Sequence, residues 1–189
     1  MGLVEVHGYA IVSDDDCIAN AAGSTPAALR NDADWAYFQA ELDRSAVTVL
    51  GRLGHQGNPN PRGRVRVVLS GSVPALKQRS DAWWWNPAGM PWADAIAQVL
   101  PQGGRVAVPG GRRVFDLFLA LGYDVFHLTR AEGVRVPAGI RLFSACQEGE
   151  TAEMVLARSG LAAGGPSVLD PAGPVSLTLW RRTTGAPRR

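Results

Sequence analysis

An acidic side chain and an aromatic ring are spaced one helical turn apart in the first quarter of the chain. Asp34 precedes Phe38 by four residues, so in a helix the carboxylate and the ring share one face. A carboxylate buried in an apolar pocket without a permanent cation can take part in protonation. The ordinary alternative is that Asp34 complements the exposed amides of the first helical turn. Asp32 is a rival for the pocket position.

Glycine and arginine adjoin at three turns: Gly51-Arg52, Gly63-Arg64 and Gly110-Gly111-Arg112-Arg113. Glycine lets a ligand approach the backbone closely, a helix start offers amide donors to an anion, and arginine adds a forked pair of N–H groups. Ser70, Ser72, Arg52 and Arg112 or Arg113 would form a set of phosphate donors at the ends of neighbouring strands. The alternatives are an ordinary turn at Arg64 and a strand-to-helix turn without a ligand at the glycine pair.

The residue pattern predicts alternating strands and helices that bring these groups together. The expected helices begin at Asn31 and span 91–100 and 112–122, and the expected strands are 3–12, 47–51, 64–70, 104–111, 124–130 and 175–182. In the first helix Trp35, Phe38 and Leu42 form a stripe that would face a sheet, and Asn31 or Asp32 can cap it. The alternation favours an α/β fold: a mainly parallel central sheet with helices on both faces and a late antiparallel C-terminal strand. Such sheets bind ligands beyond the C-terminal ends of their strands.

Composition limits the class of protein. The 189 residues predict a single domain over 1–189. A net charge of +2 with one lysine, Lys77, does not indicate nucleic acid, and Cys17 and Cys146 fit no metal-ligand spacing, so we expect no metal. We expect no membrane segment, and the cytoplasm is the default location. The sequence does not indicate an oligomeric state, and the terminal arginines 181, 182, 188 and 189 are typical of a solvated end.

Three segments resemble dihydrofolate reductases in content and order: PAALRNDADWAYF (26–38), VLGRLGHQGNPNPRGRVRVVLS (49–70) and VAVPGGRRVFDLFLALGYDVFHLTR (106–130). The sequence is therefore similar to the dihydrofolate reductase-like family, whose fold the reductase domain of the riboflavin pathway shares. The resemblance implies an NADPH-dependent oxidoreductase that transfers hydride to a pterin, a folate or a related small heterocycle. A ribosylated pyrimidine is a nearby substrate class.

The resemblance also implies roles for single residues on the substrate side. Asp34 would be the catalytic and substrate-binding acid that grips the ring nitrogen and exocyclic amine of a pterin. Thr129 would support Asp34 through a hydrogen bond, Phe38 would contact the heterocycle, and Arg64 would hold the glutamate tail of folate.

On the cofactor side, the resemblance implies that NADPH binds at the ends of the strands and the starts of the helices that follow them. Phe115 would pack beneath the nicotinamide. The residues implied in cofactor binding are Gly51, Arg52, Ser70, Ser72, Gly110, Gly111, Arg112, Arg113, Val114 and Phe115.

The chain departs from the family pattern at three places. Ala27 stands where the family has a tryptophan, and Gly54 stands where it has a hydroxyl residue that contacts phosphate. Trp83, Trp84 and Trp85 are adjacent in an expected loop, where they form either a contact surface or a hydrophobic clamp over a sheet edge. These departures support the alternative of a non-catalytic or repurposed member of the fold that binds a nucleotide or a partner protein.

Overall fold

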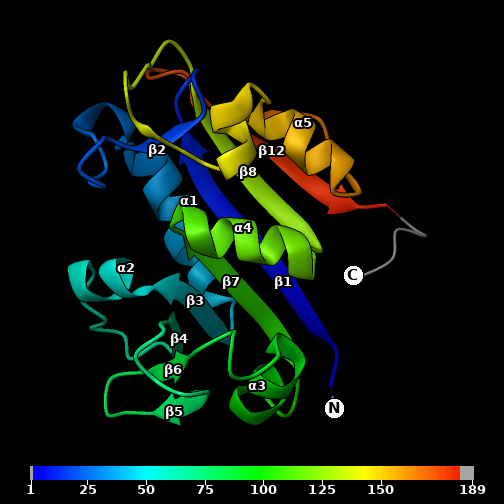
Figure 1. Cartoon of the computed structure of the whole chain (residues 1–189). Helices are drawn as coiled ribbons and strands as arrows, with labels where there is room; N and C mark the ends of the chain where they lie inside the picture. Colours follow the sequence, from blue (N-terminus) through cyan, green and yellow to red (C-terminus); the bar gives the residue numbers. More distant parts are fainter. Residues whose placement is uncertain (1, 184–189) are drawn as a thin grey trace.

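A central sheet runs through the computed structural model, which describes residues 2–183 (Figure 1). Arg188 and Arg189 lie outside the described residues. The strand order is β10-β12-β8-β1-β7-β3-β4-β6-β5, with β11 paired to β12. The strands are β1 (Val4–Val12), β3 (Val47–Gly51), β4 (Arg66–Leu69), β5 (Leu76–Gln78), β6 (Trp83–Trp85), β7 (Gly104–Gly110), β8 (Val125–Ala131), β10 (Leu161–Ala163), β11 (Ser167–Asp170) and β12 (Val175–Arg182).

The middle of this sheet is parallel and its two ends are antiparallel. β1 pairs in parallel with β7 and β8, and β3 pairs in parallel with β4 and β7. β12 runs antiparallel to β8, and β5 runs antiparallel to β6. A separate two-stranded sheet joins β2 (Cys17–Ala19) to β9 (Ile140–Arg141). The predicted mainly parallel sheet with a late antiparallel strand is confirmed.

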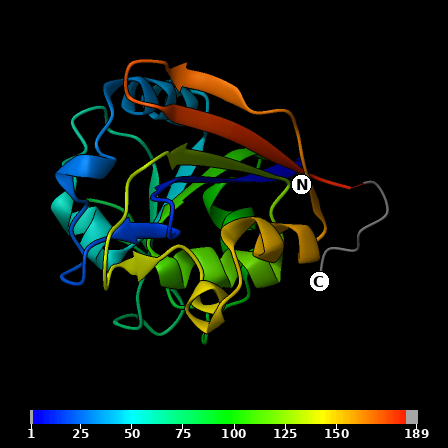
Figure 2. The same cartoon turned by 90° about the horizontal axis from the view of Figure 1, so that it is seen from above.

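Helices cover both faces of the sheet, as the sequence predicts. Figure 2 shows α1 (Asp32–Asp43) on one face, and α4 (Arg112–Leu121) and α5 (Ala152–Arg158) on the other. The Asn31 side chain caps α1 by accepting hydrogen bonds from the amides of Ala33 and Asp34. Two shorter helices complete the set: α2 (Arg52–Gly57) directly follows β3, and α3 (Trp92–Val99) directly precedes β7. Short 3-10 turns span Ala27–Leu29 and Ser144–Glu148.

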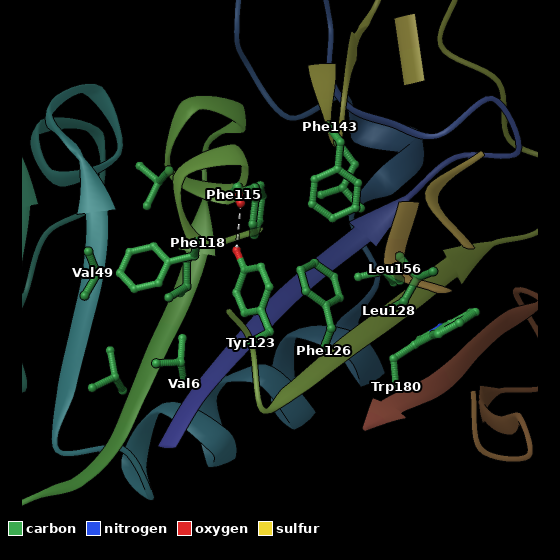
Figure 3. Close-up of a cluster of buried hydrophobic side chains, with 14 of the residues drawn as sticks. Val6, Val49, Phe115, Phe118, Tyr123, Phe126, Leu128, Phe143, Leu156 and Trp180 are labelled. Atoms are coloured by element: carbon green, nitrogen blue, oxygen red, sulfur yellow. Dashed lines mark hydrogen bonds between the residues drawn. The ribbon is translucent and has the colours of Figure 1, made fainter. Parts of the chain in front are cut away.

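The main core lies between the sheet and α4 (Figure 3). Side chains of a strand alternate between faces, so Val6 of β1 meets Phe118 of α4 on this side while Tyr9 packs against α1 on the other. Tyr123 closes the cluster: its hydroxyl donates a 3.2 Å hydrogen bond to the carbonyl of Phe115. This packing fixes the start of α4 relative to the sheet.

Two local expectations were wrong. Trp35 is not packed against the sheet: it is 56% exposed, with its ring 5.9 Å from that of Phe38, while Phe38 and Leu42 pack against Tyr9. The three tryptophans form strand β6, not a loop, and pair in parallel with β4. Trp84 and Trp85 are buried on opposite faces of that strand, so of the two alternatives for the tryptophans the structure favours hydrophobic packing near the sheet edge over a contact surface.

The region after β8 holds elements that the sequence pattern did not indicate. They include α5, β10 and β11. In residues 2–183, no helix has both the length and the apolar character that crossing a membrane requires.

Candidate functional site

A cleft of about 1700 Å³ opens at the C-terminal ends of the parallel strands. Strand register brings those ends to one level: Leu50 pairs with Gly110, and Gly51 pairs with Leu69. This is the edge where open α/β sheets bind ligands. All the residues named above as site residues line the cleft: Asp34, Phe38, Gly51, Arg52, Arg64, Ser70, Ser72, Gly110, Gly111, Arg112, Arg113, Val114, Phe115 and Thr129.

Asp34 is the half-buried acid of this cleft. Burial raises the pKa of its carboxyl above the ordinary value, and a hydrogen bond with the Thr129 side chain opposes the rise. Thr129 is itself only 2% exposed. Asp32 also borders the cleft but is exposed, and because Asn31 caps the helix, neither aspartate is needed as its cap. Asp34 is therefore the better placed of the two carboxyls to meet a ligand away from water.

The turn from β7 into α4 forms another part of the lining. Gly110 has a φ of +114°, and a Cβ there would lie 2.6 Å from the Phe115 ring. A Cβ on Gly111 would meet nothing within 4 Å, so a ligand can approach the backbone here. Val114 and Phe115 are 2% and 1% exposed, so their side chains support the wall from the core and offer little surface to a ligand.

Three arginines beside this turn have no acidic partner among the described residues. Arg52 begins α2, and Arg112 and Arg113 begin α4. The Nη1 atom of Arg112 is buried and has no hydrogen-bond partner. An unpaired buried donor is costly, so this guanidinium has an unmet need for an acceptor. Ser70 and Ser72 hydrogen-bond each other at 2.9 Å at the end of β4.

Arg64 is different, because its guanidinium is already occupied. Its Nε and Nη2 donate to Oδ1 of Asp43, at 3.2 and 2.6 Å, and its Nη1 donates to Oε1 of Gln39 at 2.9 Å. Arg62 forms a second ion pair with the same carboxylate. The donors of Arg64 are thus taken up within the chain, although the two arginines share a single carboxylate and keep a net positive charge.

A buried network of polar side chains between α1 and the sheet was not predicted from the sequence. Nδ1 of His7 and Nε2 of His127 share a hydrogen bond of 3.1 Å, and the Tyr37 hydroxyl lies 2.6 Å from Nδ1 of His127. Burial, helped by Arg105 and opposed by nearby carboxylates, lowers the pKa of His7 to about 4. Burial, followed by the charges of His7 and Arg105, lowers the pKa of His127 to about 3. Both imidazoles are therefore neutral at pH 7.

Tyr37 and His127 line the cleft, so this network gives it a polar floor. The sequence did not predict this pair, because a single polar residue in a strand usually marks a solvated face. The two histidines also lie 120 residues apart, so no local pattern links them. Together with Glu41, the histidines place metal-capable atoms within 4.8 Å of one another. Glu41 already accepts from Tyr9, Arg44 and Arg105, so internal hydrogen bonds account for this arrangement.

Gly54 and Ala27, two of the positions that differ from the dihydrofolate reductase pattern, lie in or near the cleft. Gly54 lines it, and a Cβ there would lie 3.7 Å from Leu50, an ordinary contact. The missing hydroxyl therefore reflects no lack of space. Ala27 sits in the 3-10 turn before α1, on the segment that also carries the cleft residue Leu29.

Comparison with known proteins identifies the fold. No protein-family model and no curated protein sequence matches the chain. Among solved structures, the chain is similar to dihydrofolate reductase from Enterococcus faecalis, complexed with NADP(H) and RAB-propyl, with a TM-score of 0.66 and 19% identity over 95% of this chain and 96% of that one.

Two further structures belong to riboflavin biosynthesis. One is a protein from Shewanella sp. PV-4 assigned to that pathway, with a TM-score of 0.67 and 21% identity over 95% of this chain and 99% of that one. The other is a diaminohydroxyphosphoribosylaminopyrimidine deaminase/5-amino-6-(5-phosphoribosylamino)uracil reductase from Thermotoga maritima, with a TM-score of 0.64 and 17% identity over 96% of this chain and 57% of that one. The chain thus has the dihydrofolate reductase-like fold.

Proposed function

We propose that this protein is an NADPH-dependent reductase that transfers hydride to a C=N bond of a pterin, a folate or a related heterocycle. The observation that carries the proposal is the desolvated carboxyl of Asp34, supported by Thr129, in a cleft shared with the glycine turn before α4. The fold supports a reductase, and the site residues decide the chemistry assigned to it.

Asp34 has two tasks in this proposal. Its carboxylate accepts hydrogen bonds from a ring N–H and an exocyclic amine, which orients the heterocycle. Its charge also stabilises the protonated form of the heterocycle, and its partial burial strengthens that interaction because little water screens it. Thr129 fixes the carboxyl rotamer, and the half-buried ring of Phe38 lines the same cleft.

The other side of the cleft fits a phosphorylated dinucleotide. Gly111 leaves its backbone uncovered, the first amides of α4 have no partner within the helix, and Arg52, Arg112 and Arg113 are free of acidic partners among residues 2–183. These groups would hold the phosphates, and the unpartnered Nη1 of Arg112 would gain an acceptor. NADPH, when bound, supplies the hydride.

A reductase acting on a ribosylated pyrimidine is the neighbouring hypothesis, supported by the similarity to the Thermotoga protein. A non-catalytic nucleotide-binding role is the other alternative. Burial of Trp84 and Trp85 removes the tryptophan cluster as an argument for the non-catalytic role. The departures at Ala27 and Gly54 still support that role.

Calorimetry and absorbance test the proposal together. We expect NADPH to bind at least about tenfold more tightly than NADH, since its additional phosphate can form charge-assisted hydrogen bonds. Adding a dihydropterin or dihydrofolate should then oxidise NADPH. Equal affinities for the two cofactors would contradict the phosphate assignment, and tight NADPH binding without oxidation by any pterin, folate or aminopyrimidine would favour the non-catalytic alternative.

A further inference from the structure

Arg64 lines the cleft but offers little of its charge to a ligand. An arginine has five N–H donors, and the structure gives Arg64 four internal hydrogen bonds: two to Oδ1 of Asp43, one to Oε1 of Gln39 and one to the Gln39 carbonyl. The forked Nε and Nη2 pair, which would normally receive a carboxylate, is taken up by Asp43. The position of a carboxylate ligand is thus filled from within the chain.

Helix stability does not account for Asp43. It is the last residue of α1, where a negative charge opposes the helix dipole. Its side chain is half exposed, and Arg62 and Arg64 hold the pKa of its carboxyl below the ordinary value, so it remains charged at neutral pH.

The local loop does not depend on Asp43 either. The Asn60 side chain closes the turn that precedes β4, accepting from the Arg64 amide at 3.1 Å and donating to the Arg64 carbonyl at 2.8 Å. Gln39 holds the guanidinium independently. Removing the charge of Asp43 should therefore leave Arg64 where it is.

The arginines of the cleft differ in what their guanidinium groups contact. Arg30 and Arg66 donate to backbone carbonyls and, for Arg66, to His55, with no carboxylate among their partners in the described residues. Arg52, Arg112 and Arg113 have no acidic partner among the described residues, whereas Arg62 and Arg64 share one carboxylate. The forked donor pair of Arg64 is therefore filled by a carboxylate of the chain, whereas the arginines at the glycine turn have none on theirs.

We propose that Asp43 occupies the anion position of Arg64 and makes the cleft select heterocycles without a carboxylate at that end. This inference rests on the proposed reductase function. It assigns the substrate class as a pterin with a neutral side chain, in preference to a folate with an acidic tail. Asp43 acts through Arg64 and is a specificity residue, not a catalytic one.

The substitution Asp43→Asn tests this inference, because the amide keeps the size of the side chain and removes its charge. The matched control is Glu150→Gln, which removes one charge from the ion pair with Arg158 outside the cleft. The measured quantity is the ratio of kcat/KM for dihydrofolate to kcat/KM for dihydrobiopterin. Thermal unfolding of each variant reports any loss of the tie between α1 and the loop before β4.

We expect the parent protein to show no preference for dihydrofolate, and Asp43→Asn to raise the ratio about tenfold, the effect of one charge-assisted hydrogen-bonded contact. Glu150→Gln should leave the ratio unchanged. A parent preference for dihydrofolate above tenfold, or an unchanged ratio in Asp43→Asn, overturns the inference. A purely structural role for Asp43 would lower the melting temperature without moving the ratio.

Binding separates this inference from the reductase proposal. If neither substrate is reduced, calorimetry with folate and biopterin on the protein saturated with NADP+ gives the answer. A selective gain in folate affinity in Asp43→Asn supports the occupied anion position although the reductase proposal fails. Equal or absent changes for the two probes overturn it.

Discussion

At the scale of single residues, Asp32 and Asp34 differ in burial although they stand two positions apart. Asp34→Asn should lower kcat/KM by about a hundredfold or more near neutral pH, within the range of a group assisting proton transfer, because an amide cannot stabilise a protonated heterocycle. Its unfolding free energy should change by less than about 1 kcal/mol, since Asn31 supplies the helix cap. Steady-state kinetics and urea unfolding measure the two effects.

The pH profile gives this prediction its control. The loss in Asp34→Asn should shrink at low pH, where the substrate arrives already protonated. Asp32→Asn, at an exposed position of the same helix, should be nearly silent. A damaging Asp32→Asn would show that the other carboxyl serves the cleft.

Gly54 offers a gain-of-function test of the cofactor site. An added Cβ would meet only Leu50, at 3.7 Å, so Gly54→Ser should fit and place a hydroxyl beside the expected phosphates. We expect NADPH affinity to rise about threefold to tenfold, the contribution of one hydrogen bond to a charged group. Calorimetry measures it, with Gly54→Ala as the control that adds the Cβ without the hydroxyl. Equal affinities in the serine and alanine variants would remove Gly54 from the phosphate site.

At the scale of elements, the two glycines before α4 separate folding from binding. Gly110→Ala should lower the unfolding free energy by about 2–3 kcal/mol, because its φ is +114° and its methyl group would lie 2.6 Å from the Phe115 ring. Gly111→Ala should stay within about 1 kcal/mol of the parent but weaken NADPH binding, since its methyl group would project into open space beside the cleft. Denaturant unfolding and calorimetry on both variants check the contrast. The reverse pattern would show that the glycine pair serves only the turn.

The sequence predicted the elements whose apolar spacing is regular. β1, β3, β7, α4 and β8 occur close to the expected bounds. β6 was not predicted because its three consecutive tryptophans, of which Trp84 and Trp85 are buried on opposite faces, show no alternation of apolar and polar residues. Likewise Trp35 is in helical register with the buried Leu42 but is 56% exposed, because it lies nearer the start of α1, where the helix borders the cleft.

The sequence predicted that the candidate site residues lie together, and they line one cleft, while their roles remain predictions. The residues at strand ends could be placed together because parallel strands present their C-terminal ends at one edge. The state of each side chain could not be predicted: Arg64 bound to Asp43, and His7 bound to His127, depend on contacts between distant elements. Local spacing carries no information about such pairs.

At the scale of the whole molecule, the buried histidines couple stability to pH. The folded-state pKa values of about 4 for His7 and about 3 for His127 lie below the unfolded value of 6.5, so the unfolded chain binds more protons under acid conditions. The stabilisation is complete above pH 6.5 and is lost as the pH falls toward the folded values. Between pH 7.5 and 5.5 the unfolding free energy should drop by about 2–3 kcal/mol, at 1.36 kcal/mol per unit and site.

Urea unfolding at the two pH values measures this dependence. The double substitution His7→Phe with His127→Phe should reduce the drop to less than about 1 kcal/mol, because it removes both buried bases, whatever its effect on absolute stability. A parent protein equally stable at both pH values would show that the pair is protonated, or exposed to water, in the folded state.

The fate of the transferred hydrogen tests the reductase proposal most directly. The protein is incubated with a dihydropterin and NADPH deuterated at the transferred position of nicotinamide C4, and the product is analysed by mass spectrometry. The proposed chemistry predicts one deuterium in the reduced heterocycle, with the rate of incorporation strongly lowered in Asp34→Asn and unchanged in Asp32→Asn. Binding of the labelled cofactor with no deuterium in any pterin, folate or ribosylated pyrimidine product would contradict it.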